Sequence, residues 1–394
     1  MKLVFNSEAL RPPITGVGNY AYHLLRELVA GDLIGESYCF NGEQWLSGDE
    51  QLAVTGAVKA DGSQVPGGRL SALVRDFRAA VATLPGAKAA YDGIMDRRFA
   101  SFVRDLNNAI YHEPNYVLKP FKGPCVTTVH DLSHLHFPHF HEEHVRHWLE
   151  GLPESLDRAD AIITVSNVVR QELIDMLGVA PERIHTIYEG VDEDYYPRDS
   201  TECAPVLSEY GLAHGHYVLL VATLEPRKGV DTLLAAWEQL PMSVRRDCPL
   251  ALVGSSGWHN EDIMAQIQRL GAEGTVRRLG YVPDAHLPAL FAGASVFCYP
   301  SVYEGFGLPV LDAMASGVPV ICRAGTSMAE FAEGSCVLCD SDEPEELSAT
   351  LLRLLDSADE RRRKSEQGRT QAAKFSWQRC AQETAQLYRN VLGG

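Results

Sequence analysis

The stretch Ser301-Val-Tyr-Glu-Gly-Phe-Gly-Leu-Pro-Val-Leu-Asp-Ala-Met314 decides how the rest of the chain is interpreted. A strand-like run at 295–299 ends just before it, and its second half is typical of a helix that stops near Gly317. A turn that opens a helix after a parallel strand presents free backbone N–H groups and a positive dipole end, which suit a phosphate. When ionised, Glu304 and Asp312 can only accept hydrogen bonds, and they therefore suit the O–H donors of a sugar. The stretch predicts a site for a phosphate and a sugar, against the alternative that the glycines only form the turn.

Length and composition narrow the class of protein. A chain of 394 residues exceeds one ordinary core, so we expect two domains. A net charge of −17 excludes general nucleic-acid binding, which needs a basic surface, and no apolar run is long enough to span a bilayer. Nine scattered cysteines are typical of reduced thiols, and Met1–Asn6 resembles a strand rather than a signal peptide. We therefore expect a cytoplasmic protein.

Strand-like apolar runs alternate with helical patterns along the chain, which predicts an α/β protein with doubly wound parallel sheets. Polarity and proline content rise over 195–205, which we interpret as a linker. The expected architecture is two Rossmann-like domains, 1–195 and 206–375, that face each other across a cleft, with a final helix at 376–394 packed back on the first domain. The expected strands lie at 2–5, 37–40, 109–112, 125–129, 161–164, 184–187, 217–222, 250–253, 276–279, 296–299, 318–321 and 335–338.

A second loop with chemical character follows the predicted strand that ends at Ala222. It reads Thr223-Leu-Glu-Pro-Arg-Lys-Gly-Val-Asp231 and opens a helix. Arg227 and Lys228 then lie at a helix N-terminus, where two cations and free N–H groups favour a diphosphate. The alternative is a basic first turn on the surface.

A third loop, Thr128-Val-His-Asp131, ends a strand of the first predicted domain, where open α/β sheets bind their ligands. Further histidines follow between His134 and His147, and either a metal site or an acceptor-facing surface would explain them. We favour the acceptor surface because Pro138 and aromatic residues interrupt the series. Asp192-Glu-Asp194 has the form of a metal–diphosphate motif, but its place near the predicted domain exit indicates a linker role.

The segment 69–104 is unusually basic for so acidic a chain. It carries Arg69, Arg75, Arg78, Lys88, Arg97, Arg98 and Arg104 against three acidic residues, with apolar residues at roughly helical spacing. Such a segment suits contact with an anionic membrane surface, and an ordinary surface helix is the alternative interpretation.

The stretch 301–314 resembles the Glu-x7-Glu signature of the family-4 retaining glycosyltransferases, which have the GT-B fold. This sequence departs from the pattern at Asp312, where the family usually has Glu. The loop at 223–231 is similar to the family's phosphate loop, in the Glu-Pro-Arg-Lys form common among polysaccharide mannosyltransferases. Thr15–Gly18 resembles its N-terminal glycine loop, and residues 280–283 resemble the segment that contacts the nucleotide base. Glu330 matches a family acid near the donor site, unless it is a helix-surface residue.

The resemblance implies roles for particular residues. Arg227 and Lys228 would stabilise the leaving diphosphate, Glu304 would orient the donor sugar, and His130 and Asp131 would lie beside that sugar. Catalytic roles are thereby assigned to His130, Asp131, Arg227, Lys228 and Glu304. Donor contacts are assigned to Gly16, Gly18, Thr223, Tyr281, Val282, Gly305, Phe306, Gly307, Leu308 and Asp312. Acceptor contacts are assigned to His112, Glu113 and His134.

The resemblance further implies transfer of mannose from GDP-mannose to a glycan or a polyprenyl-diphosphate-linked acceptor, in the synthesis of a surface polysaccharide. UDP-glucose and GDP-rhamnose remain alternative donors. A nucleotide-sugar epimerase and a binding module without catalysis are alternatives of other classes. We expect no metal and no cofactor beyond the nucleotide-sugar co-substrate, and contact with the inner face of the cell membrane.

Overall fold

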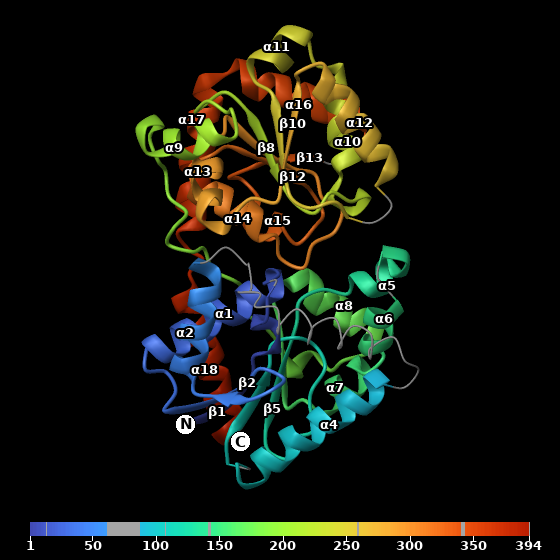
Figure 1. The fold of residues 1–394 in the computed structure, drawn as a ribbon, viewed down its shortest axis with the longest axis vertical. Coiled ribbons are helices and arrows are strands. Elements are labelled where there is room, and N and C mark those ends of the chain that lie inside the picture. The colour runs from blue at the N-terminus through green and yellow to red at the C-terminus, as the bar shows by residue number, and fades with distance from the viewer. Residues whose placement is uncertain are drawn as a thin grey trace, which may run out of the picture.

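A computed structural model describes residues 1–12, 14–60, 87–106, 108–140, 143–257, 260–339 and 343–393. The described chain forms two α/β units, one above the other in Figure 1, and each is built on its own sheet. The fold is GT-B. The part of the basic segment that carries Arg69, Arg75 and Arg78 lies outside the described residues.

The first unit contains a seven-stranded sheet in the order β3-β2-β1-β4-β5-β6-β7. All described pairs are parallel except β3 with β2. The central strands β4, β5 and β6 are buried throughout because helices cover both faces. The strands are β1 (Lys2–Asn6), β2 (Glu36–Phe40), β3 (Trp45–Leu46), β4 (Ile110–Glu113), β5 (Cys125–Val129), β6 (Ala161–Thr164) and β7 (Ile184–Thr186). The described helices are α1 (Gly16–Ala30), α2 (Gly48–Ala60), α4 (Ala87–Phe102), α5 (Ser133–His136), α6 (Glu143–Leu149), α7 (Leu152–Arg158) and α8 (Asn167–Leu177).

The second unit contains a six-stranded, wholly parallel sheet in the order β10-β9-β8-β11-β12-β13. The strand order reverses between β8 and β11, and open α/β sheets bind ligands at such a reversal. The strands are β8 (Val218–Val221), β9 (Leu250–Val253), β10 (Val276–Gly280), β11 (Val296–Tyr299), β12 (Val320–Arg323) and β13 (Val337–Cys339). The helices are α9 (Ser200–Glu209), α10 (Val230–Gln239), α11 (Met242–Asp247), α12 (Glu261–Ala272), α13 (Leu287–Ala292), α14 (Leu308–Ala315), α15 (Ala329–Ala332), α16 (Pro344–Asp356) and α17 (Ala358–Ala372).

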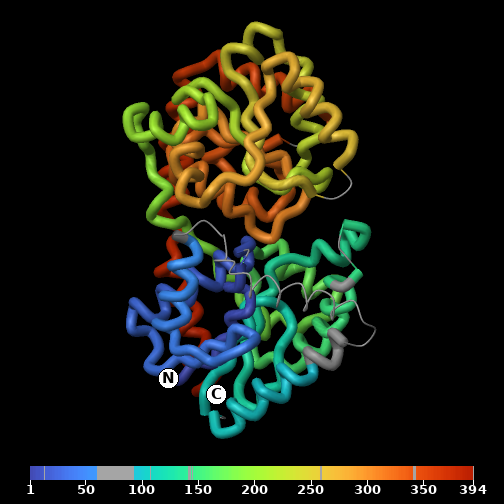
Figure 2. Tube along the Cα trace, viewed as in Figure 1, coloured from blue at the N-terminus to red at the C-terminus, as the bar shows by residue number. Residues whose placement is uncertain are grey.

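The chain crosses between the units twice, and Figure 2 shows both crossings on the same side of the molecule. Val191 on the first crossing pairs in parallel with Ser376 on the second, and Val191 N–H donates to Phe375 O at 3.2 Å. A Cβ at Gly190 would lie 2.1 Å from Trp377 N, so only glycine allows this approach. After the second crossing α18 (Trp377–Gly393) packs against α1, so both ends of the described chain lie in the first unit (Figure 1).

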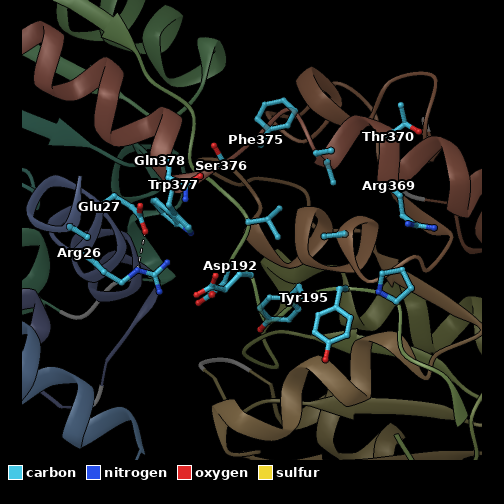
Figure 3. Close-up of a pocket in the computed structure, with 18 of the residues that line it drawn as sticks. Arg26, Glu27, Asp192, Tyr195, Arg369, Thr370, Phe375, Ser376, Trp377 and Gln378 are labelled. Carbon is cyan, nitrogen blue, oxygen red and sulfur yellow. Dashed lines mark hydrogen bonds and ion pairs between the residues drawn. The ribbon is translucent and has the colours of Figure 1, made fainter. Parts of the chain in front are cut away.

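A cavity of about 820 Å³ lies at these crossings, between α1 and α17. Figure 3 shows Arg26 on one wall and Arg369 on the other, with Asp192 and Tyr195 between them. His23 on α1 stacks on Trp377 with ring centroids 4.9 Å apart, and its Nε2 lies 3.2 Å from an Asp192 carboxylate oxygen. We call this junction of α1 with the two chain crossings, at residues 190–195 and 375–377, the hinge.

The structure differs from the sequence-based expectation in four places. The short strand β3 was not expected. The polar pattern over 142–159 predicts a single helix, but these residues form two helices, α6 and α7, separated near Gly151. Helix α9 begins inside the expected linker, where Asp199 and Glu202 form a reciprocal capping box. Gly16 and Gly18 were expected in a loop and lie in the first turn of α1.

Candidate functional site

Two loops of the second unit meet at the strand-order reversal, one after β8 and one after β11. Lys228 Nζ lies 2.6 Å from Glu304 Oε1, and Arg227 donates from Nη1 to Tyr303 O at 3.0 Å. The main chains also interlock, because Val302 N–H donates to Arg227 O at 3.0 Å. Gly229 has a φ of +67°, and a Cβ there would lie 2.4 Å from Pro300 O. Glycine at 229 therefore allows the cation loop to lie against the carboxylate loop.

The charges at this junction hold one another ionised. Burial alone would raise the pKa of Glu304, but the neighbouring Lys228 and Arg227 bring that pKa below its usual value. Burial opposes the charge of Arg227 too, yet Glu304 and Glu225 raise its pKa overall. The positions of two cations are thus fixed at this junction, where a diphosphate would find them already oriented.

The strand end of β5 faces this junction from the first unit. His130 donates from Nε2 to Pro114 O at 2.8 Å, since a carbonyl oxygen can only accept. Asp131 accepts from Ser133 N–H and Oγ–H at 2.9 and 2.7 Å. Burial would raise the pKa of Asp131, but the bonds from Ser133, followed by the charge of Arg227, lower it overall.

The two units touch at this point. A Cβ at Gly305 would lie 2.0 Å from His130 O and 3.2 Å from Asp131 Cβ. The absence of a side chain at Gly305 therefore brings the predicted catalytic residues of both units together, namely His130 and Asp131 from one side and Arg227, Lys228 and Glu304 from the other.

Helix α14 begins directly after Gly307, whose φ is +105°. Four residues into the helix, Asp312 faces a cavity of about 300 Å³ that Leu308 also lines. Burial and then the charges of Asp192 and Glu189 raise the pKa of Asp312 well above its usual value. The cavity lies between the units, because Asn19, His23 and Lys59 line it from the first unit and Asp284 and Pro288 from the second.

The remaining predicted donor residues are more dispersed. Thr223 is exposed at the end of β8, and a Cβ at Gly257 would lie 2.8 Å from its methyl group. Tyr281 is 61% exposed and Val282 is buried. A Cβ at Gly16 would meet nothing within 4 Å, whereas one at Gly18 would lie 2.5 Å from Ala9 O, so Gly18 serves packing within the first unit.

Two predicted contacts, both to an acceptor, need correction, whereas the donor contact predicted for Phe306 involves its backbone amide. The Phe306 ring packs on Tyr188 and Phe331 in the hydrophobic core, so only its backbone faces the loop. His112 and Glu113 are at most 1% exposed and therefore do not reach an acceptor in this conformation. His112 bonds Tyr388 OH at 2.5 Å and Thr128 Oγ1 at 2.8 Å, and Glu113 accepts from Asn6 Nδ2 at 2.7 Å. The final helix covers this strand end, since Tyr388 of that helix bonds His112.

The third predicted acceptor residue, His134, lies partly buried on α5, the helix whose His136 contacts Tyr303 of the second unit. Asp192 lies beside His23 at the hinge. Among the described residues no group of three or more His, Cys, Asp or Glu side chains is placed to hold a metal ion.

Sequence reasoning missed two residues of the site. Lys59 on α2 reaches the smaller cavity, where it donates to Asn19 Oδ1 at 3.2 Å, and it comes from a stretch without readable periodicity. Tyr303 lies in the stretch 301–314, but no sequence pattern there predicts that its hydroxyl contacts the other unit.

Comparisons with known proteins show which class of protein this chain belongs to. Residues 213–371 match the model "Glycosyl transferases group 1", and residues 84–195 match "Glycosyltransferase Family 4". The chain is 38% identical over 390 residues to the O-antigen chain mannosyltransferase B of Escherichia coli, covering 99% of this chain and 100% of that protein. An MMP alpha-(1->4)-mannosyltransferase of Mycolicibacterium hassiacum is 34% identical over 236 residues, 59% of this chain and 54% of that protein.

Among solved structures, Anabaena HepE in complex with UDP and glucose matches with a TM-score of 0.72 at 19% identity, over 99% of this chain and 100% of that one. The fold is that of a GT-B glycosyltransferase. Within that class the chain belongs to family 4, the retaining glycosyltransferases, and it is a hexosyltransferase.

Proposed function

We propose that the protein transfers mannose from GDP-mannose to a glycan or polyprenyl-diphosphate-linked acceptor during synthesis of a surface polysaccharide. The junction of Arg227, Lys228 and Glu304 carries the proposal, because it sets two cations where negative charge grows as the nucleoside diphosphate leaves. The names of the mannosyltransferases from E. coli and M. hassiacum support mannose as the sugar.

The proposed chemistry follows from these groups. Arg227 and Lys228 hold the diphosphate, and Lys228 can exchange Glu304 for a phosphate oxygen while Glu304 turns to the sugar hydroxyls. His130 and Asp131 border the sugar from the opposite unit, and the acceptor attacks from the face that the diphosphate leaves. Because protein cations neutralise the diphosphate, the reaction is proposed to need no metal and no further cofactor. Activity in excess chelator is therefore expected to equal activity without it.

Guanine is favoured as the base by the carboxylates around the smaller cavity. Asp192, Asp194 and Asp284 line it together with Asp312, which we propose binds the ribose of the nucleotide. The pairing edge of guanine presents two adjacent donors, N1–H and N2–H, which one carboxylate can accept together. The single N3–H of uracil lies between two carbonyl oxygens that a carboxylate repels. An acidic cavity beside the site thus suits a guanosine diphosphate better than a uridine diphosphate.

We also propose that helix α4 contacts the inner surface of the cell membrane. Its outer face exposes Ile94 and Phe102, at 52% and 44%, together with Arg97 and Arg98. Apolar and cationic side chains on one exposed face suit an anionic lipid surface, where a lipid-linked acceptor would lie. No helix among the described residues has the length and apolar character needed to cross a bilayer.

The donor is tested by thermal shift with GDP, UDP, ADP, dTDP and their sugar conjugates, since a ligand that binds only the folded state raises its melting temperature. Stabilisation by GDP and GDP-mannose, followed by mannose transfer in an assay with an isolated glycan, is the expected result. A shift with UDP-sugars alone would overturn the donor while leaving the family in place.

A further inference from the structure

A carboxylate of the second unit caps a helix of the first. Glu330 on α15 accepts from the backbone N–H of Asn167 at 2.9 Å and of Val168 at 2.8 Å, one with each carboxylate oxygen. It also accepts from Tyr188 OH at 2.8 Å. Figure 1 shows α15 at the lower end of the second unit and α8 at the upper end of the first. The bonds therefore join the two units across the cleft.

Helix α8 has 11 residues, and its own sequence satisfies only part of its first turn. The side chain of Ser166 accepts from Val169 N–H at 3.2 Å. The preceding N–H groups, of Asn167 and Val168, are those that Glu330 takes. Free N–H groups and the positive dipole end of a helix attract a carboxylate. If the units separate, this carboxylate and these two donors must return to water.

Tyr303 makes a second bond between the units on the same helix. Its hydroxyl accepts from Leu132 N–H at 2.8 Å and donates to Glu172 on α8 at 2.7 Å. Leu132 follows the His130–Asp131 pair, and Tyr303 precedes Glu304. The phenol thus ties together the two loops that carry the proposed catalytic residues of opposite units.

The segments that carry Tyr303 and Glu330 are also bonded to the junction of Arg227, Lys228 and Glu304. The backbone oxygen of Tyr303 accepts from Arg227 at 3.0 Å. Three residues before Glu330, Ser327 donates from Oγ to Glu304 O at 2.7 Å. Movement of Tyr303 or Glu330 would therefore shift Arg227 or Glu304.

We propose that Glu330 and Tyr303 form a clasp that holds the two units closed on α8, and that both are positioning residues for the transfer reaction. At the hinge the main chain itself connects the two units. The clasp connects the second unit to α8 of the first by hydrogen bonds, which can open and re-form. Closure then sets His130 and Asp131 against Arg227 and Glu304 and keeps water from the donor. The clasp acts whichever nucleotide the donor carries, so it does not depend on the proposed GDP.

The first test is small-angle scattering of the full chain without any donor, which separates the outcome from the question of donor identity. Glu330→Gln keeps the shape of the side chain but loses its charge, and Tyr303→Phe keeps the ring but loses both bonds. Each variant is expected to have a larger radius of gyration than the wild type. Glu333→Gln, at the exposed end of the same short helix, is the matched control and should not change it.

The second test measures kinetics with the donor that the wild type uses. Both variants should raise the donor KM about tenfold, the order expected for loss of a charge-assisted bond from the closed state. They should also raise the ratio of donor hydrolysis to transfer, because an open cleft admits water. A merely structural role would lower the melting temperature and the active fraction while leaving KM and this ratio unchanged. Variants that fold with unchanged scattering and unchanged ratio would overturn the clasp.

Discussion

Lys228 Nζ lies 2.6 Å from Glu304 Oε1, so a cation from the loop after β8 is held by a carboxylate from the loop after β11. Both side chains are largely buried, and the bond orients the ammonium group before a donor arrives. A catalytic cation placed in advance needs little reorganisation as charge develops on the leaving group.

Lys228→Ala is therefore expected to lower kcat/KM by about 10²–10³-fold, the range seen when one charge-stabilising donor is removed. Steady-state transfer assays measure the loss, and Lys122→Ala on the exposed surface of the first unit is the control. Full turnover in the Lys228 variant would show that this cation is structural, as a binding module would require.

Gly305→Ala should block activity while leaving each unit folded. The added methyl group would lie 2.0 Å from His130 O on the opposite unit, which forces the units apart. We expect loss of transfer with a melting temperature close to that of the wild type. Gly271→Ala on α12, where the nearest atom would be 3.6 Å away, is the control and should keep its activity. A fully active Gly305 variant would show that this close contact is not needed for catalysis.

Asp284→Asn tests the preference for guanine. The amide offers one acceptor where the carboxylate offers two, so it cannot accept both N1–H and N2–H of the base. The thermal shift with GDP should fall, and the shift with UDP should stay the same or grow. An unchanged difference between the two nucleotides would place base recognition elsewhere.

Acidification should destabilise the protein through buried histidines. Burial, with smaller contributions from Lys59 and Arg26, lowers the pKa of His23 to about 2. Burial and His130 lower the pKa of His112 to about 3. The unfolded chain binds these protons below a pKa of about 6.5 and the folded chain does not, so stability is lost as pH falls through that value.

Each histidine should reduce the free energy of unfolding by about 1.4 kcal/mol at pH 5.5 relative to pH 7.5 or above. Urea denaturation at the two pH values measures the loss. His23→Phe keeps the stack on Trp377 without a titrating ring, so its loss between the two pH values should be smaller by about that amount. An identical pH dependence in this variant would contradict the assignment to His23.

Neutralising the exposed cations of α4 tests the proposed membrane contact. Arg97→Gln with Arg98→Gln should reduce sedimentation with vesicles that contain anionic lipid, and high salt should release the wild type. Arg362→Gln with Arg363→Gln on α17 removes the same charge from the other unit and should leave sedimentation unchanged. Equal binding by both double variants would exclude α4 as the contact.

The parallel strands could be predicted because buried strands of doubly wound sheets are short apolar runs between helical patterns, as at Cys125–Val129 and Val296–Tyr299. The loops after β8 and β11 could be predicted as neighbours for a related reason, since the carboxyl ends of parallel strands share one edge. Contacts set by the placement of one unit on the other could not be predicted. The bond from Glu330 to α8 and the cover that α18 lays over His112 depend on three-dimensional packing that no local pattern carries.

The return of α18 to the first unit has a consequence for the order of synthesis. Tyr20 and Leu24 belong to a core that residues 377–393 complete, and His112 on β4 bonds Tyr388 of the same final helix. The ribosome makes residues 377–393 after the whole second unit. The second unit can therefore fold on emergence, while the first waits with part of its apolar surface uncovered. A nascent chain that is released before residues 377–393 are made therefore lacks part of the first unit's core, even though its second unit is complete.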